Sequence, residues 1–323
     1  MPRRPRLNVP GCLHHIMARG IDGTDIFRDD EDRTTFLALF EKYSAIAGVR
    51  CYAWALMGNH YHFVIRTSDR PLASLMKPLN SRYAAYFNKK MGRRGYLFQD
   101  RFKSVATQDQ LYLEEMIRYV HLNPVRAGVC KTIDSLDKYR WCGHAALLGV
   151  HENRFQDTAT VLRRFGGSNT EARRKYRVFL QAGIVEQEDT FVNRIRSSSA
   201  GTNNRTEPGM WVIGDAEFVK QATAIDTERR LRIAQHAREG WDTERVCRRV
   251  AKKLGIEPES ILQRGRGDTR SSARKIVAYV AHRTFEIPVL TIARHLGIGQ
   301  PAVSAMLAEG ERLARDLGVS IND

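Results

Sequence analysis

The alternation of apolar and polar positions predicts strands and helices in turn over roughly the first 145 residues. Four stretches are rich in aromatic and β-branched residues, as strands are: residues 13–18, 49–57, 61–67 and, as a pair of short extended segments, 96–106. Three longer stretches carry apolar residues at helical spacing: residues 30–47, a helix opened by Pro71 that ends near 89–94, and residues 110–120. The order of these elements predicts an α+β fold with a ferredoxin-like antiparallel sheet.

The pattern weakens after residue 145, where we expect a helical connector over residues 146–240. Helical stretches are predicted at 159–165 and 170–182, and residues 210–221 are expected to form a short bridging segment. Serine, glycine and asparagine near residues 197–208 give the composition of a flexible linker. The expected division is therefore a first domain over 1–145, the connector, and a third part over 241–323.

Residues 241–323 have the pattern of an all-α helix-turn-helix domain. One helix begins at Asp242 and a second covers residues 271–285. A short helix, a glycine turn and a helix with Pro301 in its first turn follow. In such a pair the second helix enters the DNA major groove, so we expect Gln300 and Ser304 to contact DNA. An ordinary αα-hairpin would give the same pattern, although the basic flank at residues 264–266 and Arg270 favours DNA binding.

The charge of the chain narrows the choice of partners. The formal net charge is +16 and the pI is near 9.9, which predicts a polyanionic partner, nucleic acid first and an anionic membrane surface second. The sequence holds no run of 18 apolar residues, so we expect no transmembrane helix and no membrane partner. The five cysteines are scattered and form no C-x-x-C pair, as in a cytosolic protein with reduced thiols.

His60 and His62 interrupt the apolar stretch over residues 57–66. Residues i and i+2 of a strand project from the same face, so the two imidazoles point the same way and could share one ion. Because the strand is predicted from residue 61, the pair is expected to span a turn at Gly58-Asn59 and the strand that follows. Two polar residues on a half-exposed sheet face would give the same pattern, so both interpretations stay open.

Tyr119 and Asn123 lie four residues apart and share one face of a helix, so a phenol hydroxyl and an amide oxygen could converge on one site. Tyr112 lies on that face too, one heptad earlier. Alternatively, Asn123 caps a new helix that starts at Pro124, and Tyr119 is an ordinary half-buried aromatic residue. Helix geometry alone does not decide between these interpretations.

The histidine strand and the stretch Tyr119-Val120-His121-Leu122-Asn123-Pro124-Val125-Arg126-Ala127-Gly128 together resemble the IS200-like single-tyrosine transposases, and more narrowly the REP-associated tyrosine transposases. Two further stretches match in order and spacing, residues 97–104 and 15–20. This resemblance covers roughly residues 8–145. Separately, residues 270–310 resemble the DNA-binding end of the bacterial replication initiator DnaA.

The resemblance implies an HUH endonuclease that cuts single-stranded DNA beside a hairpin. His60 and His62 would bind Mg²⁺ or Mn²⁺ with Asn123 as a third ligand, and Tyr119 would form a 5′-phosphotyrosine during DNA transposition. The implied setting is the bacterial cytoplasm, in association with the nucleoid, and a homodimer is left open. A hairpin-binding regulator with idle catalytic groups and a replication initiator with the same chemistry are the alternatives.

Several residues outside this centre are candidate DNA contacts. Arg66, Arg101 and Lys103 could bind phosphates, as could the basic arm over residues 1–9 and the run 89–94, although solvated surface charge is the ordinary interpretation. Tyr96, Phe98 and Phe102 could stack on bases or could be core aromatics.

Overall fold

The computed structural model describes residues 9–185, 211–263 and 269–319. The chain divides into two compact units, Met1–Asp226 and Thr227–Asp323. The predicted arm up to residue 8, the linker near 197–208 and the basic flank at 264–266 lie outside the described residues.

The first unit contains a sheet and the helices packed on it. Its strands are β1 (Leu13–Arg19), β2 (Arg50–Leu56), β3 (His60–Arg66), β4 (Lys103–Thr107) and β5 (Trp211–Ile213). Its helices are η1 (Ile21–Gly23), α1 (Asp30–Ala47), α2 (Ala73–Lys90), α3 (Asp109–Arg126), α4 (Ile133–Asp137), α5 (Gly143–Leu148), α6 (Thr158–Leu162), α7 (Asn169–Val185) and the start of α9 (Ala216–Arg238).

The five strands are ordered β2-β3-β1-β4-β5. The pairs β2–β3, β3–β1 and β1–β4 are antiparallel, and β5 pairs with β4 in parallel. The outer edge of β2 is bridged at two points, where Cys51 pairs with Gln156 and Ala55 pairs with Cys142. The molecule is thus a mixed α+β protein, as the sequence pattern predicts.

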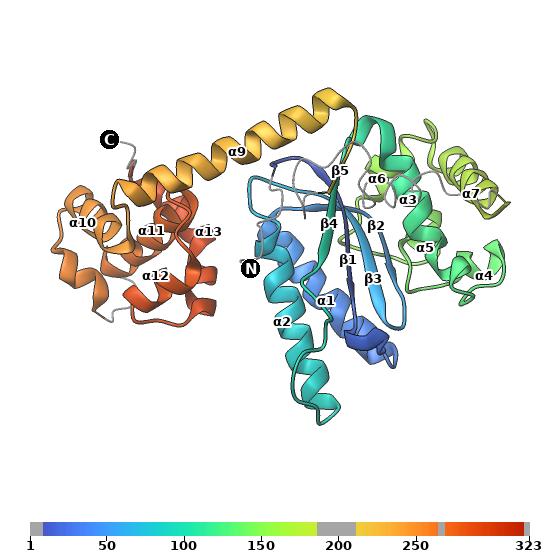
Figure 1. Cartoon of the computed structure of the whole chain (residues 1–323), viewed down its shortest axis with the longest axis horizontal. Helices are drawn as coiled ribbons and strands as arrows, with labels where there is room; N and C mark the ends of the chain where they lie inside the picture. The colour runs from blue at the N-terminus through green and yellow to red at the C-terminus, as the bar shows by residue number, and fades with distance from the viewer. Residues whose placement is uncertain (1–8, 186–210, 264–268, 320–323) are drawn as a thin grey trace. The chain divides into compact units, whose positions relative to one another are not determined.

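Helices cover both faces of the sheet (Figure 1). On one face, α1 and α2 pack an aromatic core against β3, in which Phe36, Phe40 and Tyr83 surround Tyr61 and Phe63. On the other face, α3 and the helices α5–α7 share a core with β2 and β3, which takes in members such as Val64, Val120 and Tyr176. Because successive side chains of β3 point to opposite faces of the sheet, this strand contributes residues to both cores.

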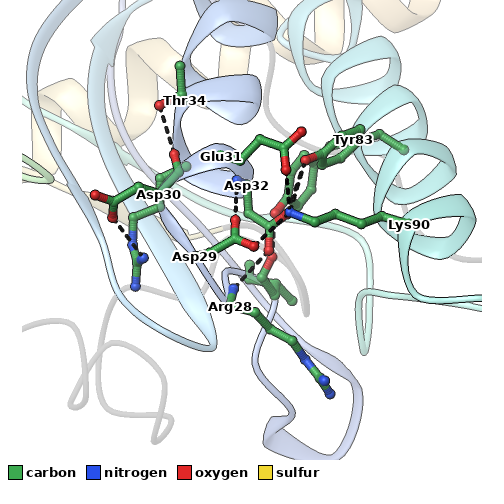
Figure 2. A network of polar contacts seen from close by, with 11 residues as sticks. Arg28, Asp29, Asp30, Glu31, Asp32, Thr34, Tyr83 and Lys90 are labelled. Carbon is green, nitrogen blue, oxygen red and sulfur yellow. Dashed lines mark hydrogen bonds and ion pairs between the residues drawn. The ribbon is translucent and has the colours of Figure 1, made fainter.

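Lys90, the last residue of α2, ties that helix to the start of α1 (Figure 2). Its Nζ donates to Asp29 Oδ2 at 2.7 Å, Glu31 Oε2 at 2.8 Å and Asp32 Oδ1 at 2.9 Å. Asp29 also caps α1 by accepting the Asp32 amide. The hydrogen bonds to Asp29 and Glu31 raise the pKa of Lys90, so its charge is retained at neutral pH.

Helix α1 has the predicted bounds and ends at Gly48, whose φ of 66° lies in the left-handed region that suits glycine. Other boundaries differ. Residues 146–185 pack into the core of the first unit, and the bridging segment at 210–221 is instead strand β5 and the start of α9. The division within α9 therefore coincides with neither 145 nor 240, because these later helices bury apolar side chains that the sheet leaves uncovered.

The second unit contains the rest of α9 with α10 (Thr243–Leu254), η2 (Pro258–Leu262), α11 (Thr269–Arg283), α12 (Val289–His295) and α13 (Gln300–Asp316). These helices enclose one apolar core. Gly310 of α13 lies against α11 so closely that a Cβ would stand 2.1 Å from the Lys275 carbonyl oxygen. Glycine at this position therefore permits the close approach of the two helices.

Among the described residues, no helix combines the length and the apolar character that crossing a bilayer requires.

Candidate active site

His60 and His62 lie on the face of β3 that looks toward α3. Val64, two residues further on, packs with Met116 and Val120 of α3. The strand begins at His60, one residue earlier than the sequence pattern indicates, so both histidines belong to it. Their ring centroids lie 5.0 Å apart. The two imidazoles therefore occupy one site, as their spacing predicts.

His60 is half-buried and held by the turn before β3. Its Nδ1 lies 2.6 Å from Asn59 Oδ1, and Asn59 Nδ2 donates to the Gly23 carbonyl oxygen at 3.0 Å. Because the amide nitrogen of Asn59 is used by Gly23, its oxygen is the atom that faces His60, and an amide oxygen only accepts. His60 must therefore donate from Nδ1, which leaves the lone pair of Nε2 free of a proton in the neutral ring.

His62 is buried and pairs with His15 of β1, whose Nε2 lies 2.9 Å from His62 Nδ1. The two ring planes are within 5° of each other. Burial lowers the pKa of His15 and of His60 to about 4, with Arg19 adding to the effect on His60. Burial also lowers the pKa of His62 well below its ordinary value. All three rings are therefore neutral at pH 7, the state in which an imidazole can bind a cation.

Tyr119 on α3 meets this histidine group directly. Its ring is edge-on to His15 at 5.4 Å and to His62 at 5.8 Å, centroid to centroid. Tyr61, which lies between the two histidines in sequence, points to the opposite face and donates to Asn80 Oδ1 of α2 at 2.8 Å. Tyr112 packs on the α3-facing core. Of the three tyrosines considered from sequence, Tyr119 is the one whose ring contacts the histidines in this arrangement.

Asn123 follows Tyr119 by one turn, inside α3, because the helix continues through Pro124 to Arg126. The alternative in which Asn123 caps a new helix is therefore wrong. Pro124 cannot donate to the Val120 carbonyl, and Asn123 Nδ2 replaces that donor at 3.3 Å while also donating to the Tyr119 carbonyl at 2.8 Å. Both bonds use the amide nitrogen, so the carbonyl oxygen of the Asn123 side chain is the group that remains for a ligand.

The three basic residues predicted to contact phosphates differ in their position relative to the histidines. Lys103 is exposed and pairs with Met17, which in turn pairs with His62, so its side chain lies on the histidine face about 10 Å away. Arg66 ends β3, roughly 20 Å from His60, and donates to the Tyr52 hydroxyl and the Gly11 carbonyl. Arg101 is exposed just before β4. Lys103 therefore lies closer to the histidine pair than Arg66 does.

The remaining predicted DNA contacts differ in their exposure to solvent. Phe102 is buried and Phe98 packs on the aromatic core, whereas Tyr96 is 84% exposed. Lys90 is occupied by carboxylates, as described above, so it is unsuited to DNA. Gln300 and Ser304 are exposed, one turn apart at the start of α13.

Three residues of this site were not singled out from sequence. His15 and Asn59 lie inside the stretches that carry the resemblance, and each contacts a candidate ligand. Arg126 lies in the Tyr119 stretch; its guanidinium stands 5.3 Å from the Tyr119 ring centroid and donates to the Tyr119 carbonyl at 3.2 Å. Partnerships across strands or around a proline turn leave no local periodic signal, so they become visible only in the fold.

A second histidine–tyrosine cluster joins His121 of α3, His144 of α5 and Tyr176 of α7. The Tyr176 hydroxyl lies 2.7 Å from His121 Nδ1 and 2.8 Å from His144 Nδ1. His144 Nε2 lies 2.7 Å from Asp137 Oδ1, and Arg177 Nε donates to the other oxygen of Asp137 at 2.8 Å. We call this group, which is buried except at Asp137 and Arg177, the closed cluster, and His15, His60, His62 and Tyr119 the open cluster.

Comparison with known proteins agrees with this description of the first unit. Residues 8–123 match the family model "Transposase IS200 like". The match covers roughly the first third of the chain and includes His60, His62, Tyr119 and Asn123. No curated protein matches the chain.

Among solved structures, the chain is similar to a REP-associated tyrosine transposase bound to a REP hairpin. The identity is 15%, the alignment covers 49% of this chain and 94% of the other, and the TM-score is 0.38, too low to assign a fold by itself.

Proposed function

We propose that the chain is a metal-dependent single-stranded DNA endonuclease and strand transferase of the transposase type, which acts beside hairpin DNA. The observation that carries the proposal is the edge-on contact of Tyr119 with His62, beside a second histidine on the same strand face. The IS200-like match over residues 8–123 supports the reaction class. The ferredoxin-like description of β1 to β4 belongs to the same proposal, and the strand order β2-β3-β1-β4 supports it.

The residues that would hold a divalent cation are His60, His62 and Asn123. His60 keeps an unprotonated Nε2, and the Asn123 carbonyl oxygen is not used by the two bonds of its amide nitrogen. Two neutral imidazoles and an amide would leave the full charge of the ion for a phosphate. Mg²⁺ or Mn²⁺ bound here would polarise the scissile phosphate and offset its negative charge.

In the proposed reaction the Tyr119 hydroxyl attacks the scissile phosphorus. A bond forms between the tyrosine oxygen and phosphorus, the bond from phosphorus to the 3′-oxygen breaks, and the phenol proton is balanced by the proton that the 3′-hydroxyl gains. The 5′ end of the DNA is then attached to the protein. Because one phosphate ester replaces another, a 3′-hydroxyl can reverse the step and join strands without ATP.

The test is a denaturing gel of the protein incubated with a labelled single-stranded hairpin substrate and Mn²⁺. We expect a protein-linked DNA band for the wild type and for Tyr112→Phe, and none for Tyr119→Phe, which should still bind the substrate. A band that persists in Tyr119→Phe and disappears in Tyr112→Phe would move the nucleophile to Tyr112.

We also propose that α12, the turn at Gly297 and α13 form a helix-turn-helix that contacts double-stranded DNA. Gln300 and Ser304 would face the DNA, and their exposure on the first turns of α13 supports this. The double variant Gln300→Ala, Ser304→Ala should weaken duplex binding about tenfold or more, measured by fluorescence anisotropy. Equal affinity of wild type and variant at several salt concentrations would mean that α13 does not contact DNA.

A further inference from the structure

Each of the two histidines proposed as cation ligands has one ring nitrogen held by a neighbouring polar group of this chain. For His60 that group is Asn59, at 2.6 Å from Nδ1. For His62 it is His15, at 2.9 Å from Nδ1. In both rings the nitrogen that remains is Nε2. The same nitrogen is thus left available in two histidines that share one strand face.

We propose that His15 and Asn59 are positioning residues that fix the tautomers of His62 and His60, so that both rings present an unprotonated Nε2 to one divalent cation. This inference rests on the proposed function. Histidines that bind metals commonly donate their other ring N–H to a carboxylate, a carbonyl or water, which sets both the tautomer and the orientation of the ring. Here the acceptors are a neutral imidazole and an amide.

The orientation of the Asn59 side chain is set by the turn in which this residue lies. The Gly20 amide donates to the Asn59 carbonyl at 2.8 Å, and Asn59 Nδ2 donates to the Gly23 carbonyl at 3.0 Å. The amides of Ile26 and Phe27 both donate to the carbonyl of Gly58. Residues 20–27 therefore hold the turn before β3, and the amide oxygen of Asn59 is directed at His60.

The His15 half depends on which ring donates. If His62 donates from Nδ1, its Nε2 keeps a lone pair; if His15 donates from Nε2 instead, His62 carries its proton on Nε2 and cannot bind a cation there. Only the first arrangement gives His60 and His62 the same available nitrogen. His15 is then protonated on Nδ1 and accepts at Nε2.

The acceptor position in His15 makes a matched pair of variants available. The oxygen of a glutamine amide can reach the place of a histidine Nε2, whereas that of asparagine corresponds to Nδ1 because its side chain is shorter. His15→Gln should therefore retain the acceptor and His15→Asn should lose it. His14→Gln is the control, because His14 points to the opposite sheet face and contacts Ser104 Oγ.

Two measurements test the inference on the full chain. Long-range ¹H–¹⁵N NMR of histidine-labelled protein without metal reads the tautomers, and Mn²⁺ titration followed by electron paramagnetic resonance reads the affinity without DNA. We expect Nδ1–H tautomers for His60 and His62 in the wild type and in His14→Gln. In His15→Asn we expect the Nδ1–H form of His62 to be lost and Mn²⁺ affinity to fall about 10–100-fold, with His15→Gln within a few-fold of wild type.

Asn59→Ala should have the corresponding effect on His60, because it removes the acceptor oxygen that holds Nδ1. An Nε2–H tautomer of His62 in the wild type, or equal Mn²⁺ affinity in His15→Asn and wild type, would overturn the inference. Failure of the proposed function would look different: the tautomers would be as expected, yet the wild type would bind no Mn²⁺ or form no DNA adduct. Thermal melting of each variant shows that a lost affinity is not lost folding.

Discussion

The open and closed clusters both combine histidines with a tyrosine, and α3 contributes one residue to each, but the two clusters differ in their exposure to solvent. In the closed cluster the hydrogen bonds run in one direction: Asp137 accepts from His144, His144 accepts from Tyr176, and Tyr176 accepts from His121. This order follows because the aspartate can only accept, and burial lowers the pKa of His144 so that its ring is neutral.

In the open cluster the polar partners satisfy Nδ1 of His60 and His62 and leave the other nitrogen available. His60 and Tyr119 are both half-buried, so solvent reaches them. The closed cluster instead joins α3 to α7 in the core, where Tyr176 is fully buried. His121 Nε2 also has no hydrogen-bond partner among the described residues, but it is buried, so the exposed edge of the open cluster is what distinguishes the two.

The sharpest test exchanges each tyrosine for phenylalanine. Tyr119→Phe should reduce adduct formation by a factor on the order of 10⁶, as loss of a nucleophile does, with little change in stability. Tyr176→Phe should leave the cleavage rate of folded protein intact but lower the free energy of unfolding by about 1–3 kcal/mol, because two buried imidazoles lose their partner. Gel assays and urea unfolding of both variants measure the two effects, and a cleavage defect in Tyr176→Phe at full folding would break the comparison.

A smaller contrast is expected for one histidine from each cluster. His60→Ala should slow cleavage by a factor on the order of 10²–10³, because a preorganised electrostatic contact to the phosphate is lost, and should barely alter unfolding. His144→Ala should lower the free energy of unfolding by about 2–4 kcal/mol and leave cleavage by the folded fraction unchanged. Single-turnover cleavage with excess enzyme separates these outcomes. Cleavage by His60→Ala at the wild-type rate would mean that His60 is not part of the active site.

Acid should act on both clusters at once. The unfolded chain binds protons on its histidines as the pH falls through about 6.5, whereas folded His15 does so only near 4, and burial holds the pKa of His121 well below the ordinary value. Stability is therefore fully present above about pH 7 and is lost as the pH falls from 6.5 toward 4, by about 3 kcal/mol for a group like His15. Urea unfolding between pH 7.5 and 4.5 measures this loss, and a stability independent of pH in that range would contradict it.

The weakest contrast concerns two arginines, Arg126 next to the open cluster and Arg177 within the closed cluster. Arg126→Lys keeps the charge but loses the planar group over the Tyr119 ring, and we expect adduct formation to slow about tenfold. Arg177→Lys weakens an ion pair with Asp137 that is partly solvated, so the free energy of unfolding should fall by less than about 1 kcal/mol. If Arg126→Lys cleaves at the wild-type rate, this guanidinium is only a structural contact of α3.

The features of this molecule that the sequence predicts are those that follow from the local spacing of apolar and polar residues. The bounds of α1, the shared face of His60 and His62, and the opposite direction of Tyr61 follow from the 3.6- and 2-residue repeats and are confirmed. The sequence also allows a helix start at Pro124, but the Asn123 amide supplies the hydrogen bond that proline lacks, and α3 continues. The pairs His15–His62 and Tyr176–His144 join residues 47 and 32 positions apart, so no short window of sequence could predict them.

The parallel pair β4–β5 has a consequence for how this protein is made. Val105 pairs with Trp211, so the outer edge of β4 finds its partner only after about a hundred further residues have been synthesised. At ribosomal rates of about 5–20 residues per second, that edge waits roughly 5–20 s with its backbone groups unpaired. Unpaired edges are sites of aggregation, and a lysine at the start of the strand is a common protection against it. Lys103 occupies that position in β4 and is exposed, so its charge opposes edge-to-edge association of the nascent chain before the sheet is complete.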